Sequence, residues 1–194
     1  MVLEIEKTVK YLNNGGIIIY PSDTIWAIGC DATNQNSINR IYKLKKRCKS
    51  LPLICLMSNY KMIKKYTNIN QSIIDVLSVL EKPITVIYEE VKNLETYSDS
   101  IGIRIPKDPF CNNLLKEFKK PIISTSVNIS GEKFPIYFKD INNTILEKVD
   151  YAVNLKRNQK LDKASKIIKI NKDGSITTLR SWNVWKFNKK KYKY

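Results

Sequence analysis

The first clear pattern in the chain is an amphipathic segment followed by a short apolar run. Apolar residues recur at helical spacing from Leu3 to Leu12, and the segment ends at Asn13-Asn14-Gly15-Gly16, which is typical of a helix C-terminus. The next run, Ile17 to Tyr20, is continuously apolar and is bounded by glycine and proline. Such a run predicts a strand that is buried on both faces, as in an α/β sheet.

Strands and helices alternate along the rest of the chain. Helical spacing predicts helices at 34–47, Tyr60 to Tyr66, Gln71 to Leu80, Pro109 to Phe118 and Asp140 to Lys148. Apolar runs predict strands at Leu53 to Met57, Ile84 to Tyr88, Ile101 to Ile105, Ile122 to Thr125, Lys166 to Ile170 and Ser175 to Leu179. The turn sequence "NKDGS", from Asn171 to Ser175, predicts a hairpin between the last two strands. This alternation predicts one α/β domain around a largely buried sheet.

Composition narrows the cellular setting. The sequence has no apolar run near the eighteen or so residues that span a membrane, and its acidic, amphipathic beginning differs from a signal peptide. We therefore expect a cytosolic protein that makes no membrane contact. The four cysteines are scattered without a C-x-x-C pair, so neither a zinc site nor a disulfide framework is predicted.

Net charge and histidine content limit the ligands and the catalytic groups that the protein can use. The formal net charge of +16 favours polyanionic ligands such as nucleoside triphosphates or RNA, although compositional bias towards lysine explains it equally well. The sequence contains no histidine, which excludes Ser-His-Asp and Cys-His nucleophilic machinery and histidine metal ligands. Any chemistry must therefore depend on lysine, arginine, carboxylates, hydroxyls or a bound cation.

The chain ends in a basic aromatic segment. The last nine residues, "KFNKKKYKY", contain five lysines and no acidic residue. We divide the chain into a domain at 1–180 and a tail at 181–194. The tail either contacts RNA through charge and stacking or is a solvated terminus, and the second interpretation is favoured.

Two polar segments follow predicted strands. "YPSDTIWAIGCDATN", from Tyr20 to Asn34, places hydroxyls and a carboxylate where α/β sheets hold ligands. "PIISTSVNISGE", from Pro121 to Glu132, places serine, threonine and asparagine after another strand. Each segment is either a ligand-binding loop or ordinary turn chemistry. Neither is a Walker loop or a dinucleotide-binding glycine loop.

Three basic residues lie at positions that predict burial. Lys45 falls on the apolar face of the helix predicted at 34–47, so it must reach an edge of the core or meet an anion. Arg47 follows two residues later, and the pair suits a triphosphate or, alternatively, complements the helix dipole. Arg104 lies on the opposite face of its strand from Ile101 and Ile103, where it pairs with a carboxylate of the protein or of a ligand.

Taken in order, "PSDTIWAIGCDA", "KKR" followed by "LPL", "IRIP" and "STSVNISG" resemble the threonylcarbamoyl-AMP synthase family, also called the YrdC-like domain. These motifs cover Pro21 to Gly131, and "ASKI" and "LRS" extend the resemblance to about Arg180. The length resembles the short, single-domain bacterial type. The resemblance implies a YrdC-like α/β fold, with a twisted, largely buried mixed sheet and flanking helices.

The resemblance also implies a reaction and a set of site residues. The family makes L-threonylcarbamoyladenylate from L-threonine, bicarbonate and ATP, with Mg²⁺ and with release of pyrophosphate. This is the first step of tRNA threonylcarbamoyladenosine formation, and other proteins then transfer the group to tRNA. The implied residues are Thr24, Arg104, Ser126 and Ser165 for threonine; Lys45, Arg47, Ser100, Asn128 and Arg180 for ATP; Lys45 and Arg47 for catalysis; and none for a metal.

Two alternatives stay open at this level. The first is an RNA-binding module of the YrdC-like family, which the positive charge and the basic tail favour. The second is a related carbamoyl-adenylating enzyme with another acceptor substrate. Intact Lys45, Arg47 and Arg104 favour an enzyme, because buried charges without partners cost stability and a binding module has no need to keep them.

Overall fold

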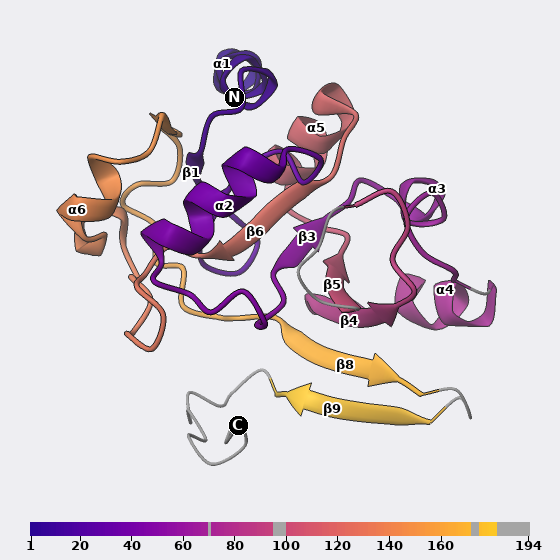
Figure 1. Ribbon diagram of the computed structural model, residues 1–194. Coiled ribbons are helices and arrows are strands. Elements are labelled where there is room, and N and C mark those ends of the chain that lie inside the picture. Colours follow the sequence, from indigo (N-terminus) through magenta and orange to yellow (C-terminus); the bar gives the residue numbers. More distant parts are fainter. Residues whose placement is uncertain (70, 95–99, 172–174, 182–194) are drawn as a thin grey trace.

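A computed structural model describes residues 1–69, 71–94, 100–171 and 175–181 (Figure 1). The strands are β1 (Ile18–Pro21), β2 (Trp26–Gly29), β3 (Ile54–Leu56), β4 (Ile84–Glu89), β5 (Ser100–Arg104), β6 (Ile122–Ser126), β7 (Tyr151–Ala152), β8 (Lys166–Ile170) and β9 (Ile176–Arg180). The helices are α1 (Val2–Asn13), α2 (Gln35–Leu44), α3 (Tyr60–Ile63), α4 (Gln71–Ser78), α5 (Pro109–Phe118), α6 (Asn143–Leu146) and the 3-10 helix η1 (Phe138–Asp140).

The described strands form one mixed sheet in the order β7-β1-β2-β6-β3-β5-β4-β8-β9. Three pairs are parallel, namely β1 with β7, β3 with β5, and β4 with β8. The remaining neighbours are antiparallel. The α/β fold and the mixed sheet predicted from the sequence are thus confirmed.

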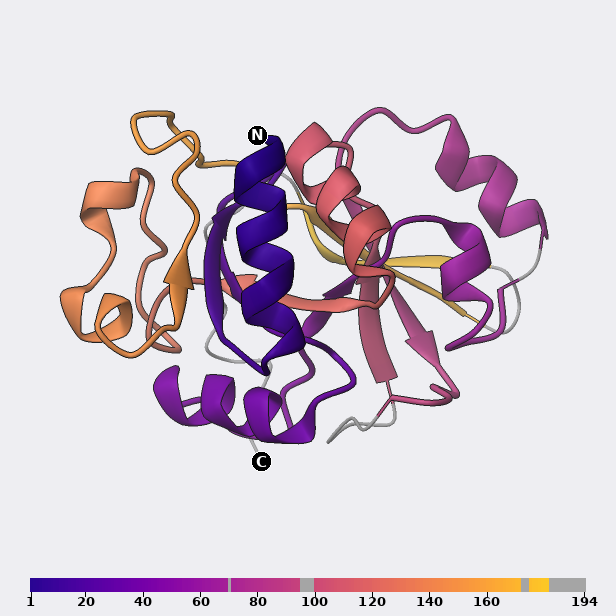
Figure 2. The same cartoon turned by 90° about the horizontal axis from the view of Figure 1, so that it is seen from above.

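The two faces of the sheet carry different helices. Ile17 and Ile19 of the first apolar run join the cluster that contains the buried side of α2. Ile18 and Tyr20 face the other way, into a cluster with α1 and α5. Figure 2 shows α1 and α5 side by side over the sheet. Burial on both faces explains why the first strand is continuously apolar.

The structure corrects the sequence prediction between Tyr20 and Asn34. This segment was predicted to be a loop, but it contains β2, which pairs antiparallel with β1 in a register that joins Pro21 to Trp26. Serine, aspartate and threonine make the hairpin turn. The apolar run from Trp26 to Gly29 is only four residues long, so its strand character was hidden by the turn residues around it.

Gly29 explains how β2 approaches β6 so closely. A Cβ atom at this position would lie 2.1 Å from the carbonyl oxygen of Ile123, which is far inside contact distance. Only glycine avoids this clash, because the obstacle is backbone and cannot rotate away. The neighbouring pairing of Ala27 with Ser126 depends on this approach.

Other differences between prediction and structure concern the presence and the length of short elements. The helix predicted at Asp140 to Lys148 is reduced to α6, which η1 precedes, and β7 was not predicted. Strands β8 and β9 pair antiparallel as predicted, while the turn at 172–174 and the tail from 182 onwards lie outside the described residues. The predicted helix at 34–47 ends at Leu44.

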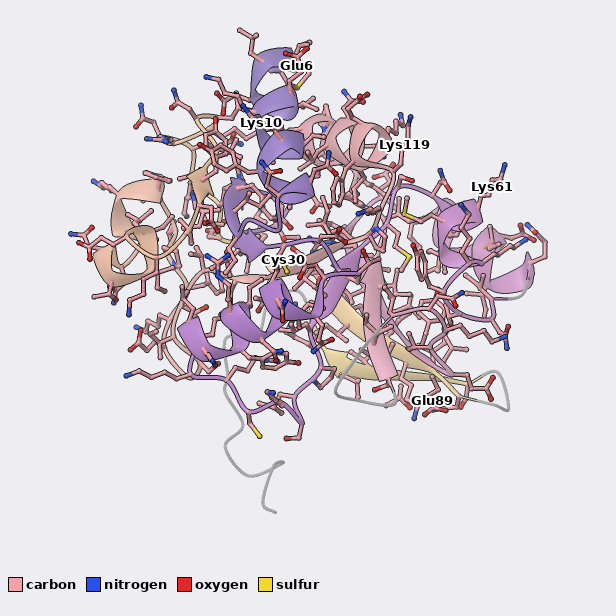
Figure 3. All side chains as sticks on the ribbon, turned by 45° about the horizontal axis from the view of Figure 1, so that its top comes forward. Glu6, Lys10, Cys30, Lys61, Glu89 and Lys119 are labelled. Carbon is pink, nitrogen blue, oxygen red and sulfur yellow. The ribbon has the colours of Figure 1, made fainter. Side chains whose placement is uncertain are left out.

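Charged side chains lie mainly at the periphery. Figure 3 shows Glu6, Lys61, Glu89 and Lys119 projecting outwards, whereas Cys30 lies in the interior. None of the helices in the described part of the chain is long and apolar enough to cross a bilayer. The buried charges described next are therefore exceptions to the general pattern.

Candidate active site

Arg104 is a buried cation at the end of β5, with only 4% of its surface exposed. Strand alternation turns it away from Ile101 and Ile103 and towards the face that α5 covers. Its Nη1 donates a hydrogen bond to Thr24 Oγ1 at 3.1 Å, and its Nη2 lies 3.1 Å from Asp23 Oδ1. The structure thus brings together two predicted threonine-binding residues, Thr24 and Arg104, that are 80 positions apart in sequence.

The turn between β1 and β2 holds Asp23 and Thr24 in place. Ser22 Oγ accepts hydrogen bonds from the backbone amides of Thr24 and Ile25, each at 3.1 Å, and donates to the carbonyl of Ile25 at 2.7 Å. Ser22 Oγ also lies 2.8 Å from Thr24 Oγ1. A local side-chain network of this kind limits the conformations of the turn, so the two side chains meet Arg104 in a defined geometry.

A second pair of predicted residues, Ser165 and Arg180, is also in direct contact. Arg180 donates from Nε to the Ser165 carbonyl at 3.0 Å and from Nη2 to Ser165 Oγ at 3.2 Å. Buried Ser165 and Thr85 share a hydrogen bond of 2.8 Å between their hydroxyls. Burial, and secondarily the charge of Arg104, lowers the pKa of Arg180 to about 10. The guanidinium groups of Arg180 and Arg104 are therefore close enough for their charges to interact.

Lys45 lies at the end of α2, where the backbone turns sharply. Lys46 adopts a left-handed conformation with φ of 48°, and its amide donates to the Lys43 carbonyl at 3.1 Å. The amide of Arg47 donates to the Tyr42 carbonyl at 2.9 Å. These two bonds form a Schellman motif without glycine. The helix therefore ends before Lys45, and the turn directs the Lys45 side chain inwards.

Backbone carbonyls surround the buried ammonium group of Lys45. The residue is 1% exposed, and its Nζ donates to the carbonyls of Ser126 and Asn128, at 2.7 Å to the latter. The end of β6 thus supplies two backbone acceptors to this buried ammonium group. Burial, and secondarily the charge of Arg47, lowers the pKa of Lys45 to about 7.

Arg47 is only partly buried and lies close enough to Lys45 for the two charges to interact. Its Nη2 donates to the Pro52 carbonyl at 2.9 Å and its Nε to the Leu51 carbonyl at 3.4 Å. The loop after α2 thus wraps around the guanidinium group. Lys45 and Arg47 are therefore neighbours, with Lys45 held by the end of β6 and Arg47 by the loop after α2.

Asn128 stands between this basic pair and an open cavity of about 530 Å³. Its Nδ2 donates to the carbonyls of Ile129 and Glu132, at 3.0 and 2.8 Å. Its Oδ1 is buried without a hydrogen-bond partner among the described residues. The cavity is lined by Val127, Asn128, Glu132, Lys133, Pro135, Lys139, Asp140, Ile141, Asn142 and Asn143.

Strand pairing connects the two basic groups. Ser126 lies opposite Ala27, and the Val127 amide donates to the Trp26 carbonyl at 3.2 Å. The carbonyls that hold Lys45 are therefore next to the strand that follows the Thr24 turn. Ser100, by contrast, begins β5, while Arg104 ends it, so the structure does not bring these two predicted residues together.

Two site residues were not assigned from the sequence. Asp23 was seen only as a carboxylate within the first motif, yet it is the ion-pair partner of Arg104. Thr85 lies in the apolar run "PITVIY", and it is completely buried against Ser165. A single hydroxyl within an apolar strand was the available indication for Thr85, and the adjacency to Thr24 was the indication for Asp23.

The fold and these groups define a class of protein. Four cations come from three parts of the fold: Arg104 from β5, Arg180 from β9, and Lys45 and Arg47 from the turn after α2. Within the described residues no group of three or more histidine, cysteine, aspartate or glutamate side chains is placed to hold a metal ion. The class is an α/β protein with one mixed sheet and with buried cations that contact polar side chains and backbone carbonyls.

Comparison with known proteins identifies the family. Residues 10–181 match the family model for Sua5, YciO and YrdC proteins, which carries the description "Telomere recombination". A protein of Methanocaldococcus jannaschii, provisionally named a threonylcarbamoyl-AMP synthase, is 34% identical over 181 residues, or 91% of this chain and 84% of the relative. The threonylcarbamoyl-AMP synthase of Pseudoalteromonas translucida is 28% identical over 158 residues, covering 77% of this chain and 84% of the relative.

The chain belongs to the Sua5/YciO/YrdC family. A solved structure with the same fold is that of Pyrococcus abyssi Sua5 complexed with L-threonine, with a TM-score of 0.81 and 18% sequence identity. That alignment covers 91% of this chain and 53% of the Sua5 chain, so this chain spans about half the length of that Sua5 protein.

Proposed function

We propose that this chain is a threonylcarbamoyl-AMP synthase, an enzyme that makes L-threonylcarbamoyladenylate from L-threonine, bicarbonate and ATP and releases pyrophosphate. Family membership and the names of the similar proteins support this activity. The complex of P. abyssi Sua5 with L-threonine supports the amino acid substrate. Residues 1–180 constitute the catalytic domain in this proposal, and 181–194 the tail.

The observation that carries the proposal is the hydrogen bond between Arg104 and Thr24. The resemblance assigns both residues to threonine, although they come from motifs 80 positions apart, and the fold joins them at 3.1 Å. In the proposal Arg104 binds the carboxylate of threonine, because a guanidinium offers the fork of donors that matches a carboxylate. Thr24 and Ser126 contribute polar contacts to the same substrate.

Lys45 and Arg47 act on the triphosphate in this proposal. When the α-phosphorus is attacked, negative charge accumulates on the departing pyrophosphate, and cations that are already in place stabilise it. Lys45 is held by two carbonyls and Arg47 by two others, so neither needs to reorganise during the reaction. Asn128, Ser100 and Arg180 complete the proposed ATP contacts.

The proposed chemistry has two steps. In the first, bicarbonate gives carbon dioxide and hydroxide, and the amine of threonine forms a bond to the carbon of the carbon dioxide. The proton that the amine loses combines with the hydroxide to form water. In the second, a carboxylate oxygen of the resulting N-carboxythreonine attacks the α-phosphorus of ATP, and the bond to pyrophosphate breaks. Arg104 keeps the other carboxylate of threonine away from the phosphorus, so that it does not compete. The contact between Ser165, assigned to threonine, and Arg180, assigned to ATP, supports a site in which the two substrates lie next to each other.

Mg²⁺ is proposed to arrive with ATP and to be bound mainly by phosphate oxygens and water. The ion typically keeps several water ligands and uses few protein carboxylates at triphosphate sites. This agrees with the described part of the chain, which offers no cluster of three ligating side chains. When bound, the ion supplies further charge neutralisation for the phosphates.

The biological setting is also part of the proposal. The adenylate serves tRNA modification, and separate proteins transfer its threonylcarbamoyl group. A net charge of +16 is compatible with RNA contact, and the lysine-rich tail is a candidate for it. A cytosolic location stays a prediction from the sequence.

The test measures pyrophosphate release and the mass of the adenylate, using the full chain with ATP, Mg²⁺, bicarbonate and L-threonine. We expect release only when both threonine and bicarbonate are present, because the attacking carboxylate contains both. Serine and alanine serve as amino acid controls. Release with another acceptor would reject threonine as the substrate, and no release with any acceptor would reject the enzymatic function in favour of RNA binding.

A further inference from the structure

Buried polar atoms that lack hydrogen-bond partners are the most informative feature left after the known motifs are placed. Among the described residues these atoms are Tyr20 OH, Asp23 Oδ1, Trp26 Nε1, Tyr88 OH, Arg104 Nε, Asn128 Oδ1 and Ser130 Oγ. Two of them, Asp23 Oδ1 and Arg104 Nε, belong to the same ion pair. A buried unsatisfied group costs stability, so such groups at a site indicate where a ligand can bind.

The ion pair is close but does not satisfy either member. Asp23 Oδ1 lies 3.1 Å from Arg104 Nη2, and the two side chains are 7% and 4% exposed. The geometry at Oδ1 is not that of a hydrogen bond, so the attraction is mainly Coulombic. Among the described residues, the other oxygen, Oδ2, accepts one long bond of 3.3 Å, from the Lys107 amide. Asp23 thus keeps acceptor capacity, and Arg104 keeps a donor.

An α-amino acid matches this pair, because it carries a donor and an acceptor on one carbon atom. Its ammonium group needs a carboxylate, and its carboxylate group needs a guanidinium. We propose that Asp23 is the binding residue for the ammonium group of the amino acid substrate, beside Arg104, which binds its carboxylate. This inference rests on the proposed function for the position of the carboxylate, and it assigns a role to Asp23 that neither the motifs nor the relatives' names provide.

The proposal also explains why a carboxylate stands next to the substrate-binding arginine. Arg104 alone would attract any small carboxylic acid. The negative charge of Asp23 weakens the attraction of Arg104 for an anion. A ligand that also carries a positive charge is attracted by both residues. A hydroxy acid would leave Asp23 without a cationic partner. The pair therefore selects a zwitterion over a simple anion.

The turn that carries Asp23 is suited to a fixed binding contact. Ser22 Oγ ties the amides of Thr24 and Ile25, and Thr24 accepts from Arg104. Hydrogen bonds therefore hold both the side chain of Thr24, next to Asp23, and the guanidinium group of Arg104. Side chains that are already ordered lose little conformational entropy when a ligand binds. The interaction between Asp23 and an ammonium group therefore contributes more of its free energy to the affinity.

The experiment compares two ligands by calorimetric titration of the full chain. One is L-threonine, and the other is (2S,3R)-2,3-dihydroxybutanoate, in which a hydroxyl replaces the amine. We expect the wild-type chain to prefer threonine by at least about tenfold, and Asp23→Asn to lose most of that preference by weakening threonine alone. Equal weakening of both ligands would overturn the proposal, because it would mean that Asp23 acts only by orienting Arg104. Unchanged threonine binding would also overturn it.

Asp31→Asn is the matched control, because Asp31 is likewise a buried member of an ion pair, with Lys120, and lies beyond the other end of β2. It should keep the ligand preference. If Asp23→Asn fails to fold in a thermal melt, the wild-type preference decides: a ratio near one overturns the proposal, and a large ratio supports it. Pyrophosphate release by the wild-type chain is measured in parallel. If the expected preference for threonine is found but no pyrophosphate is released, only the proposed function is rejected. If pyrophosphate is released but Asp23→Asn keeps the wild-type preference for threonine, only the role of Asp23 is rejected.

Discussion

The two buried cations of the site, Arg104 and Lys45, are stabilised in different ways. Arg104 has a carboxylate beside it, in Asp23, and a hydroxyl, in Thr24. Lys45 has two backbone carbonyls, and within the described residues it has no ion-pair partner. Carbonyls supply partial charge only, and the pKa of Lys45 falls to about 7. The fold therefore places a full negative charge beside one cation and only the partial charges of carbonyls beside the other.

The largest effect expected from this comparison is on catalysis. Lys45→Met removes the charge but keeps the stem, and we expect kcat/KM for adenylate formation to fall roughly a hundredfold to a thousandfold, since a cation that stabilises developing charge is lost. Lys46→Met is the matched control, because Lys46 is adjacent and exposed. Steady-state pyrophosphate release measures both. A Lys45→Met chain with the parental rate would show that Lys45 has only a structural role.

The second expected effect is a difference in protein stability between a variant of Arg104 and a variant of Lys45. Arg104→Gln should lower the free energy of unfolding by about 3 kcal/mol, because Asp23 becomes a buried carboxylate without a cation. Lys45→Met leaves no unpaired charge and should cost less. Urea denaturation measures both variants. Adding Asp23→Asn to Arg104→Gln should restore part of the loss, and a double variant as unstable as the sum of the single ones would argue against the pairing.

The third effect is the pH dependence of stability. The folded pKa of Lys45, about 7, lies below the unfolded value of 10.5, so between these values the unfolded chain holds a proton that the folded chain has released. Stability therefore rises with pH across this window. The free energy of unfolding of the wild type, minus that of Lys45→Met, should increase between about pH 7 and about pH 10. A difference that does not change with pH would mean that Lys45 stays charged in its buried position.

The smallest effect concerns the turn that positions Lys45. Lys46 has a positive φ, which glycine adopts without a steric penalty. Lys46→Gly should therefore raise the free energy of unfolding by up to about 1 kcal/mol and leave adenylate formation unchanged. Thermal melts and pyrophosphate release test this. A loss of activity would indicate that the Lys46 side chain itself acts on the triphosphate, and would weaken the contrast between buried and exposed lysines.

Most of the secondary structure followed from local patterns. Apolar runs and alternating apolar positions predicted β1, β3, β4, β5, β6, β8 and β9. In β1 every residue is buried, whereas four of the five residues of β9 are exposed, so burial on both faces explains the apolar run only for strands such as β1. The strands that were missed, β2 and β7, are too short for a periodic pattern to emerge. The prediction that Lys45 is buried is confirmed, since its position on the apolar face required it, but its carbonyl partners after β6 could not be inferred from local pattern.

The sequence by itself determined the α/β class, the buried character of Lys45 and Arg104, and the motifs that resemble the family. Tertiary structure alone decided which side chains meet: Thr24 with Arg104, Ser165 with Thr85, and Lys45 with the carbonyls after β6. The physical reason is that local propensity depends on neighbours in sequence, whereas a buried polar group is satisfied by whatever the sheet register places against it. Asp23 illustrates this, because it became the partner of Arg104 only when β1, β2 and β5 were in place.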